Sequence, residues 1–175
     1  MAVSKEREIR KDKLLGYYLK VDEKFVLLNV GFTELTESPS AQSSAKRYIG
    51  DSSQTKRITS YDWSTAFNAD QIRSQEAIEF ICDIGELQKT GADAETEYII
   101  VDLDKPGTES NTFRARKFNI AIEVASFDNN DGELAATGNF LGQGDPILGT
   151  FNTSTNTFEE GFSPKVTMLS RKDGK

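Results

Sequence analysis

The 175-residue sequence contains no histidine and a single cysteine, Cys82. Without an imidazole base, the chain cannot form the histidine-dependent triads of serine and cysteine hydrolases, and most zinc sites with nitrogen ligands are excluded as well. One cysteine cannot form an internal disulfide, so we expect folding in a reducing cytoplasm, with Cys82 as a small buried side chain in a helix. The sequence predicts no catalytic residues, no cofactor and no metal site.

Long apolar runs are also missing, and positive charge is in deficit. No run approaches the roughly 20 apolar residues that a membrane-spanning helix needs, and residues 1–7 lack the apolar core of a secretory signal. The net charge of −7 predicts a surface that repels nucleic acid. Tyr61, Trp63 and Phe67 could stack on single-stranded nucleic acid, but their odd-numbered spacing places them on one strand face, which favours a core role.

Alternating and apolar segments predict β-strands along most of the chain. Phe118, Ile120 and Ile122, for example, share one strand face. The predicted fold is mainly β: an antiparallel β-sandwich or barrel with one packed α-helix, over about residues 69–89, and a long loop, over about residues 37–57. The predicted strands cover residues 14–21, 25–35, 58–67, 97–103, 113–127, 133–141, 147–151 and 155–162.

The predicted helix has start, stop and packing signals. Asn68 and Gln71 have the spacing of a capping box, and Gly91 is placed to end the helix in a left-handed conformation. Between them, apolar side chains recur every three or four residues and form one stripe. The stripe consists of Ala77, Phe80, Ile81, Ile84 and Leu87. These features predict a helix that packs on the core.

The segment 37–57 is rich in Ser, Gln and Lys and has no periodicity. Connections in compact domains are usually about 4–6 residues long, and structureless runs beyond about 12–15 residues are mostly functional or disordered. The segment also contains Tyr48 and Ile49, which suits a loop that becomes ordered only against a neighbouring chain. A flexible surface loop is the simpler interpretation of the segment alone.

Two acidic patterns have simpler explanations than a ligand site. The run Asp128–Glu133 has some features of a calcium loop, but Gly132 occupies the fifth position, where an EF-hand needs an oxygen ligand. A β-turn explains this run better. Asp102 and Asp104 share a strand face and could act as paired carboxylates, but an ordinary solvated turn at the end of a strand is the better interpretation.

Two longer segments are informative together. Residues 32–91 read FTELTESPSAQSSAKRYIGDSSQTKRITSYDWSTAFNADQIRSQEAIEFICDIGELQKTG, and the later segment combines GNFLGQGDPILGTFN with TFEEGF. They resemble the major tail protein, or tail tube protein, of tailed bacteriophages that infect Gram-positive bacteria. The resemblance covers roughly residues 14–162, and its motifs are structural, not catalytic.

The resemblance implies a structural virion protein, not an enzyme. Such a subunit would self-assemble into homo-hexameric rings that stack into a tail tube, a conduit for DNA ejection into the host. Its partners would be further copies of itself, the tape measure protein, the tail terminator, and baseplate or tail-tip proteins. Assembly would take place in the bacterial host cytoplasm. DNA would pass through the lumen without specific binding, and no membrane partner is expected.

The resemblance and the strand pattern together indicate candidate residues. The candidate lumen-facing carboxylates, which would repel DNA phosphate, are Glu34, Asp62 and Glu123, because each lies in a predicted strand with a face outside the core. The candidate inter-subunit residues of the loop are Ser38, Lys46, Arg47, Tyr48 and Ile49.

We expect a charged N-terminal arm over residues 1–13, a single tail tube-like β domain over residues 14–170 and a C-terminal tail over residues 171–175. The alternative function is a monomeric ligand- or carbohydrate-binding β-sandwich, or a baseplate module, with its aromatic residues exposed in a cleft.

Overall fold

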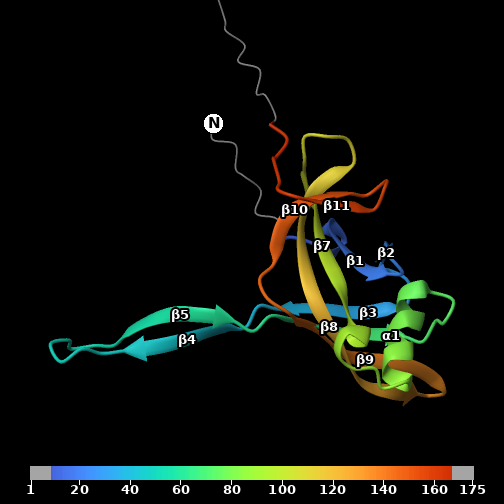
Figure 1. Cartoon of the computed structure of the whole chain (residues 1–175), viewed down its shortest axis with the longest axis horizontal. Coiled ribbons are helices and arrows are strands. Elements are labelled where there is room, and N and C mark those ends of the chain that lie inside the picture. Colours follow the sequence, from blue (N-terminus) through green and yellow to red (C-terminus); the bar gives the residue numbers. More distant parts are fainter. Residues whose placement is uncertain (1–8, 167–175) are drawn as a thin grey trace, which may run out of the picture.

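The computed structural model describes residues 9–166. The predicted C-terminal tail, residues 171–175, lies outside them, as do residues 1–8 of the predicted arm. The strands form a nine-stranded sheet and a separate two-stranded hairpin, and every strand pairing is antiparallel (Figure 1). The predicted class, mainly antiparallel β with one packed α-helix, is confirmed. None of the helices in this part of the chain is both long and apolar enough to cross a membrane.

The large sheet follows the order β2-β1-β7-β8-β9-β6-β3, with β10 paired to β8 and β11 paired to β10. β2 and β3 end this path without pairing to each other, so the described strands form an open sheet and not a closed barrel. The strands of this sheet are β1 (Leu15–Val21), β2 (Lys24–Leu27), β3 (Phe32–Ser38), β6 (Ser64–Asp70), β7 (Glu95–Pro106), β8 (Thr112–Asn130), β9 (Glu133–Gly142), β10 (Ile147–Asn152) and β11 (Thr157–Glu160).

The main core lies between this sheet and the helix α1 (Glu76–Glu86), which packs on β8. Ile81 and Ile84 of α1 are buried in one cluster with Tyr98, Ile120 and Phe140 of the sheet. Among the described elements, the β10–β11 hairpin covers one end of the opposite sheet face. There Phe151 is fully buried and packs on Tyr18, with ring centroids 4.4 Å apart.

The helix differs from its prediction at its start. It begins at Glu76, because residues 64–70 form β6. Asn68 pairs with Glu34 on β3 and with Thr137 on β9, and no side chain caps the helix at Gln75. The predicted capping box is therefore wrong: strand pairing on both sides of β6 outweighs the local capping signal.

The helix end also differs. Gln88 adopts the left-handed conformation at φ 51°. The N–H of Lys89 donates to the carbonyl of Ile84 (3.0 Å) and that of Gln88 to Gly85 (3.3 Å), which is the Schellman pattern. Gly91 begins the short 3-10 helix η2 (Gly91–Ala94) instead of ending α1. Leu87 is 65% exposed, so it does not belong to the apolar stripe.

Gly85 lets the helix approach the sheet closely. A Cβ atom added at this position would lie 2.7 Å from the Phe127 ring and 2.8 Å from Val124 on β8. Both distances are shorter than ordinary contacts of a Cβ atom, so an alanine would require these side chains, β8 or the helix to move. The glycine that lowers helix propensity is thus required by packing.

The predicted long loop is mostly β-structure. β4 (Ala41–Lys46) and β5 (Thr55–Tyr61) pair as a separate antiparallel hairpin that projects away from the large sheet (Figure 1). Only residues 47–54 at its tip are without strand structure. Every residue from 39 to 62 is exposed, so neither face of the ribbon is buried and the sequence lacks the alternation that identifies a half-buried strand.

Both ends of the described region contact the end of β7. On the N-terminal side, Arg10 lies just before the 3-10 turn η1 (Asp12–Leu14) and contacts Asp102 and Asp104. On the C-terminal side, the N–H of Lys165 donates to the carbonyl of Pro106 (3.1 Å), and residues 107 and 164 form an isolated β-bridge.

Candidate assembly surfaces

One half of the large sheet exposes a largely polar face that no other element within residues 9–166 covers. Glu34 on β3 pairs with Asn68 on β6, which pairs with Thr137 on β9. In the next row, Glu123 on β8 pairs with Asn139 on β9. Residues that pair across antiparallel strands share a face, and both rows face away from the core. The structure thus brings two of the three candidate lumen-facing carboxylates onto one surface.

We call this surface the open face. Apart from Leu141, which is 39% exposed, its side chains are small, amide or acidic; all are exposed or half-buried, and none is a lysine or arginine. Ser126 and Thr137 share a hydrogen bond of 2.6 Å between their hydroxyl groups, and Ser126 also donates to Asp128 at 3.2 Å. The open face comprises Glu34, Thr36, Ser38, Ser64, Ala66, Asn68, Ala121, Glu123, Ser126, Asp128, Thr137, Asn139 and Leu141.

Asp62, the third candidate, lies elsewhere. It is exposed between β5 and β6, where the hairpin joins the body, and its N–H donates to the carbonyl of Ser40 (3.0 Å). Its carboxylate is therefore at the base of the hairpin and not in the rows that contain Glu34 and Glu123.

The five candidate inter-subunit residues divide between the two ends of the hairpin. Ser38 is half-buried at the end of β3, opposite Ser64. Lys46 ends β4, and residues 47–49 follow in the tip. Tyr48 is 61% exposed and Ile49 is fully exposed, and the Lys46 ammonium lies 5.1 Å from the centre of the Tyr48 ring. The tip thus combines apolar and basic side chains without cover.

The hairpin differs from the rest of the chain in charge. Residues 41–61 contain four basic side chains and one acidic side chain, Asp51, within a chain whose net charge is −7. The basic residues are Lys46, Arg47, Lys56 and Arg57, all in the half of the hairpin nearest the tip. A two-stranded ribbon is at best marginally stable alone in water, and this hairpin is exposed along its whole length.

A groove of about 640 Å³ lies at the base of the hairpin, between β5 and the loop that follows β9. Ile58, Tyr61 and Asp62 line it on the hairpin side, and Phe118 and Asp145 are among the residues on the body side. Tyr61 is 65% exposed here. Its predicted place on a core face with Trp63 and Phe67 is wrong, because the chain leaves the hairpin between residues 61 and 63.

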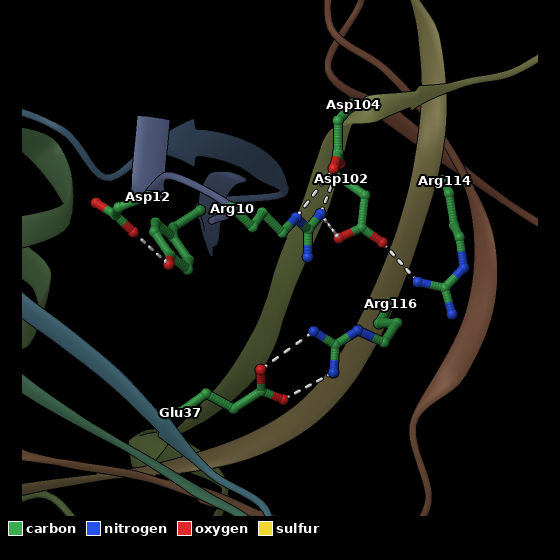
Figure 2. A network of polar contacts seen from close by, with 8 residues as sticks. Arg10, Asp12, Glu37, Asp102, Asp104, Arg114 and Arg116 are labelled. Carbon is green, nitrogen blue, oxygen red and sulfur yellow. Dashed lines mark hydrogen bonds and ion pairs between the residues drawn. The ribbon is translucent and has the colours of Figure 1, made fainter. Parts of the chain in front are cut away.

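Hydrogen bonds between charged and aromatic side chains hold the residues at the floor of this groove together. Arg116 on β8 donates two hydrogen bonds to Glu37 on β3 (2.7 and 3.1 Å) (Figure 2). The Trp63 indole N–H donates a third hydrogen bond to Glu37 (2.8 Å). Burial disfavours the charged carboxylate, but these hydrogen bonds outweigh it and lower the pKa of Glu37. Trp63 stacks on Phe118 at 3.9 Å between ring centroids. The charged side chains of the floor are therefore paired with each other.

A second group of ion pairs lies nearby at the end of β7. Asp102 has a side chain only 1% exposed and accepts hydrogen bonds from Arg10 (2.7 Å) and Arg114 (2.6 Å), while Arg10 also binds Asp104 (2.6 Å) (Figure 2). The prediction of an ordinary solvated turn is therefore wrong for Asp102. Both oxygens of this carboxylate are occupied by guanidinium groups, so it is a structural anchor and not a general base.

Nothing in the local sequence identifies Arg10 as the partner of Asp102, since 92 residues separate them. The position of Asp102 directly after the apolar run Ile99–Val101 was the available signal for burial. Among residues 9–166, no group of three or more His, Cys, Asp or Glu side chains could hold a metal ion.

Comparison with known proteins places the fold. No family model matches this sequence, and no curated protein sequence matches it significantly. Among solved structures, a chain of the tail of an empty gene transfer agent (GTA) particle with C6 symmetry aligns with a TM-score of 0.58. The two chains are 11% identical, and the alignment covers 79% of this chain and 97% of the other.

A chain of the virion of a native GTA particle aligns similarly, with a TM-score of 0.54, 12% identity, and coverage of 80% of this chain and 98% of the other. A chain of the anti-feeding prophage baseplate aligns with a TM-score of 0.48 and 10% identity over 77% and 91% of the two chains, and adds nothing to the fold assignment. The chain therefore shares its fold with a component of a phage-like tail.

Proposed function

We propose that this chain is a structural subunit of a phage-like tail, and that its copies form hexameric rings that stack into a tube around the passage for DNA. The observation that carries this proposal is the fold shared with a chain of a C6-symmetric tail, over 97% of that chain. The match also covers 79% of this chain, so it is not confined to a small motif.

The open face suits the inner wall of such a tube. DNA is densely negative, and a wall with carboxylates and no cations repels its phosphates. Glu34 and Glu123 would face the bore in this arrangement, among small hydroxyl and amide side chains. A wall of this kind lets DNA slide past without specific binding.

The sheet edges and the hairpin suit contacts between copies. β2 and β3 end the sheet path with one side unpaired among the described residues, and an unpaired strand edge is a ready template for pairing with another chain. The exposed β4–β5 hairpin, with Lys46, Arg47, Tyr48 and Ile49 at or beside its tip, would contact an adjacent subunit. Further partners would be the tape measure, the tail terminator, and baseplate or tail-tip proteins of the virion.

Particle size tests the proposal. We expect the purified chain to form rings or tubes as its concentration rises, measured by light scattering and negative-stain electron microscopy. The matched variant replaces residues 42–60 with Asn-Gly, which closes the pair Ala41 and Tyr61 with a two-residue turn. This variant should fold, as judged by circular dichroism, but stay small.

If the unaltered chain stays monomeric at all concentrations, the proposal fails, and a monomeric ligand-binding sandwich or baseplate module takes its place. If the shortened variant forms normal tubes, the hairpin is not an assembly element.

A further inference from the structure

The groove at the base of the hairpin has two carboxylates without a cationic partner. Of its charged lining residues, Glu37 and Arg116 neutralise each other. Asp62 and Asp145 are exposed, and neither forms an ion pair within residues 9–166. The rim of the groove is therefore negative, while its walls contain the exposed apolar side chains of Ile58 and Tyr61.

The tip of the same hairpin has the complementary character. Lys46 and Arg47 supply positive charge beside the exposed side chains of Tyr48 and Ile49. The basic tip and the acidic groove cannot meet within one chain, because they lie at opposite ends of one ribbon. Strands rise about 3.3 Å per residue, so the six residues of β4 hold the tip roughly 20 Å from the base.

We infer that the hairpin tip of one copy of this chain docks into the groove at the hairpin base of a second copy. The contact deepens the proposed function, on which it rests, by naming the occupant of the groove. Tip and groove are different surfaces of the same chain, so the contact is heterologous, and heterologous contacts repeat into rings or filaments. Each subunit would give its tip to one neighbour and receive the tip of another.

In the docked arrangement, Lys46 and Arg47 would lie against Asp62 and Asp145, and Tyr48 and Ile49 against the apolar walls. Opposite charges that are exposed before docking accelerate association, and salt screens this effect. Assembly of the unaltered chain should therefore slow as the salt concentration rises.

Charge exchange tests the pairing. We expect Lys46→Glu/Arg47→Glu to slow assembly by about tenfold or more at low salt, because like charges then meet at the groove. Asp62→Lys/Asp145→Lys should do the same. Combining the two pairs should restore assembly. The matched control combines the tip variant with Asp93→Lys/Glu109→Lys, which changes two exposed carboxylates outside the groove and should not restore it.

A cross-link provides a second measurement. Ile49→Cys/Pro146→Cys should give a ladder of covalently linked chains when assembled protein is oxidised, whereas each single variant should not. Cys82 is buried and does not compete.

The outcomes separate the two claims. An unaltered chain that never assembles overturns the proposed function. The docking is overturned, and the proposed function stands, if the unaltered chain assembles but the other two measurements fail. They fail if the groove variant gives no rescue or the control rescues equally, and if no cross-linked ladder forms.

Discussion

Asp102 illustrates how a buried carboxylate stays charged in this fold. Burial alone would raise its pKa, but the hydrogen bonds and charges of Arg10 and Arg114 outweigh burial, and the pKa is lowered. The pKa of Asp104 is lowered as well, first by its hydrogen bonds from Arg10. Arg10 therefore stabilises two carboxylates at once and fastens the segment before β1 to the end of β7.

Replacing Arg10 with alanine should destabilise the fold by about 1–2 kcal/mol at neutral pH, measured by urea denaturation. The effect is moderate because the Arg10 side chain is 42% exposed and Arg114 still binds Asp102. The lowered pKa values mean that the contribution is present above the ordinary aspartate value of 3.8 and is lost as the pH falls through the lower folded-state values. The difference between variant and parent should thus disappear in acid.

Arg57→Ala on the exposed hairpin is the matched control, since Arg57 forms no ion pair among the described residues. It should leave the unfolding free energy of the monomer unchanged. A difference between Arg10→Ala and the parent that does not shrink as the pH falls below the ordinary aspartate value of 3.8 would contradict the ion-pair explanation.

Single residues were predictable where burial alone decides their environment. Cys82 is fully buried in α1, as expected for a lone cysteine in an apolar helix. Asp102 and Tyr61 were not predictable in the same way, because the environment of each depends on elements distant in sequence. A guanidinium 92 residues away neutralises Asp102, and the projection of the hairpin removes Tyr61 from the core.

At the scale of elements, the helix was predictable in kind and less so in extent. Its apolar period identified the buried residues Ala77, Ile81 and Ile84. Its start was misplaced by seven residues, from 69 to 76, because β6 has a sequence that is compatible with a helix N-terminus and becomes a strand through pairing with β3 and β9. Pairing partners are a tertiary property that local patterns do not contain.

Replacing Ile81 with aspartate should unfold the subunit or nearly so. Ile81 is 1% exposed in the main core, and an unpaired carboxylate there costs about 3 kcal/mol or more, against a total stability of about 5–15 kcal/mol for a typical domain. The melting temperature from circular dichroism measures the loss. Leu87→Asp, in the same helix region but 65% exposed, should melt within a few degrees of the parent. Equal melting of both variants would contradict the assignment of the buried helix face.

The hairpin was recognised as unusual but not as β-structure. Its length and its isolated aromatic residue indicated a segment with a role of its own, whereas its strands are exposed on both faces and therefore carry no alternating pattern.

At the scale of the whole molecule, the antiparallel β class was predictable from strand spacing and turn residues. The open sheet path was not, since the choice between a closed barrel and an open sheet depends on whether β2 meets β3. The open face was partly predictable: Glu34 and Glu123 were selected for their position on non-core strand faces, and the register places them on one surface. Asp62 was selected by the same criterion, but it lies where the strand pattern is interrupted.

If the open face lines the bore, the double variant Glu34→Lys/Glu123→Lys should convert a repelling wall into a binding one. Exposed positions tolerate such changes within about ±0.5 kcal/mol each, so assembled particles should still form. They should bind DNA with an affinity that falls steeply as salt rises, because bound phosphates release counterions. Filter binding over a salt series measures this.

Asp93→Lys/Glu109→Lys makes the same change in net charge at exposed positions off the open face. Both variants gain positive charge, so only a larger gain in DNA retention for the open-face variant supports the assignment. Equal retention would mean that Glu34 and Glu123 do not line the passage.

Both ends of the described region attach to the end of β7, so the order of the elements along the chain could change without a change in how they pack. Arg10 binds Asp102, and Pro164 forms a β-bridge with Gly107, only five residues further along the chain. The path between them is therefore topologically close to a ring, and cutting it at another exposed point, such as the hairpin tip, would preserve every strand pairing of the large sheet. A circular permutation at such a point should therefore move the chain ends and leave the pairing of the large sheet intact.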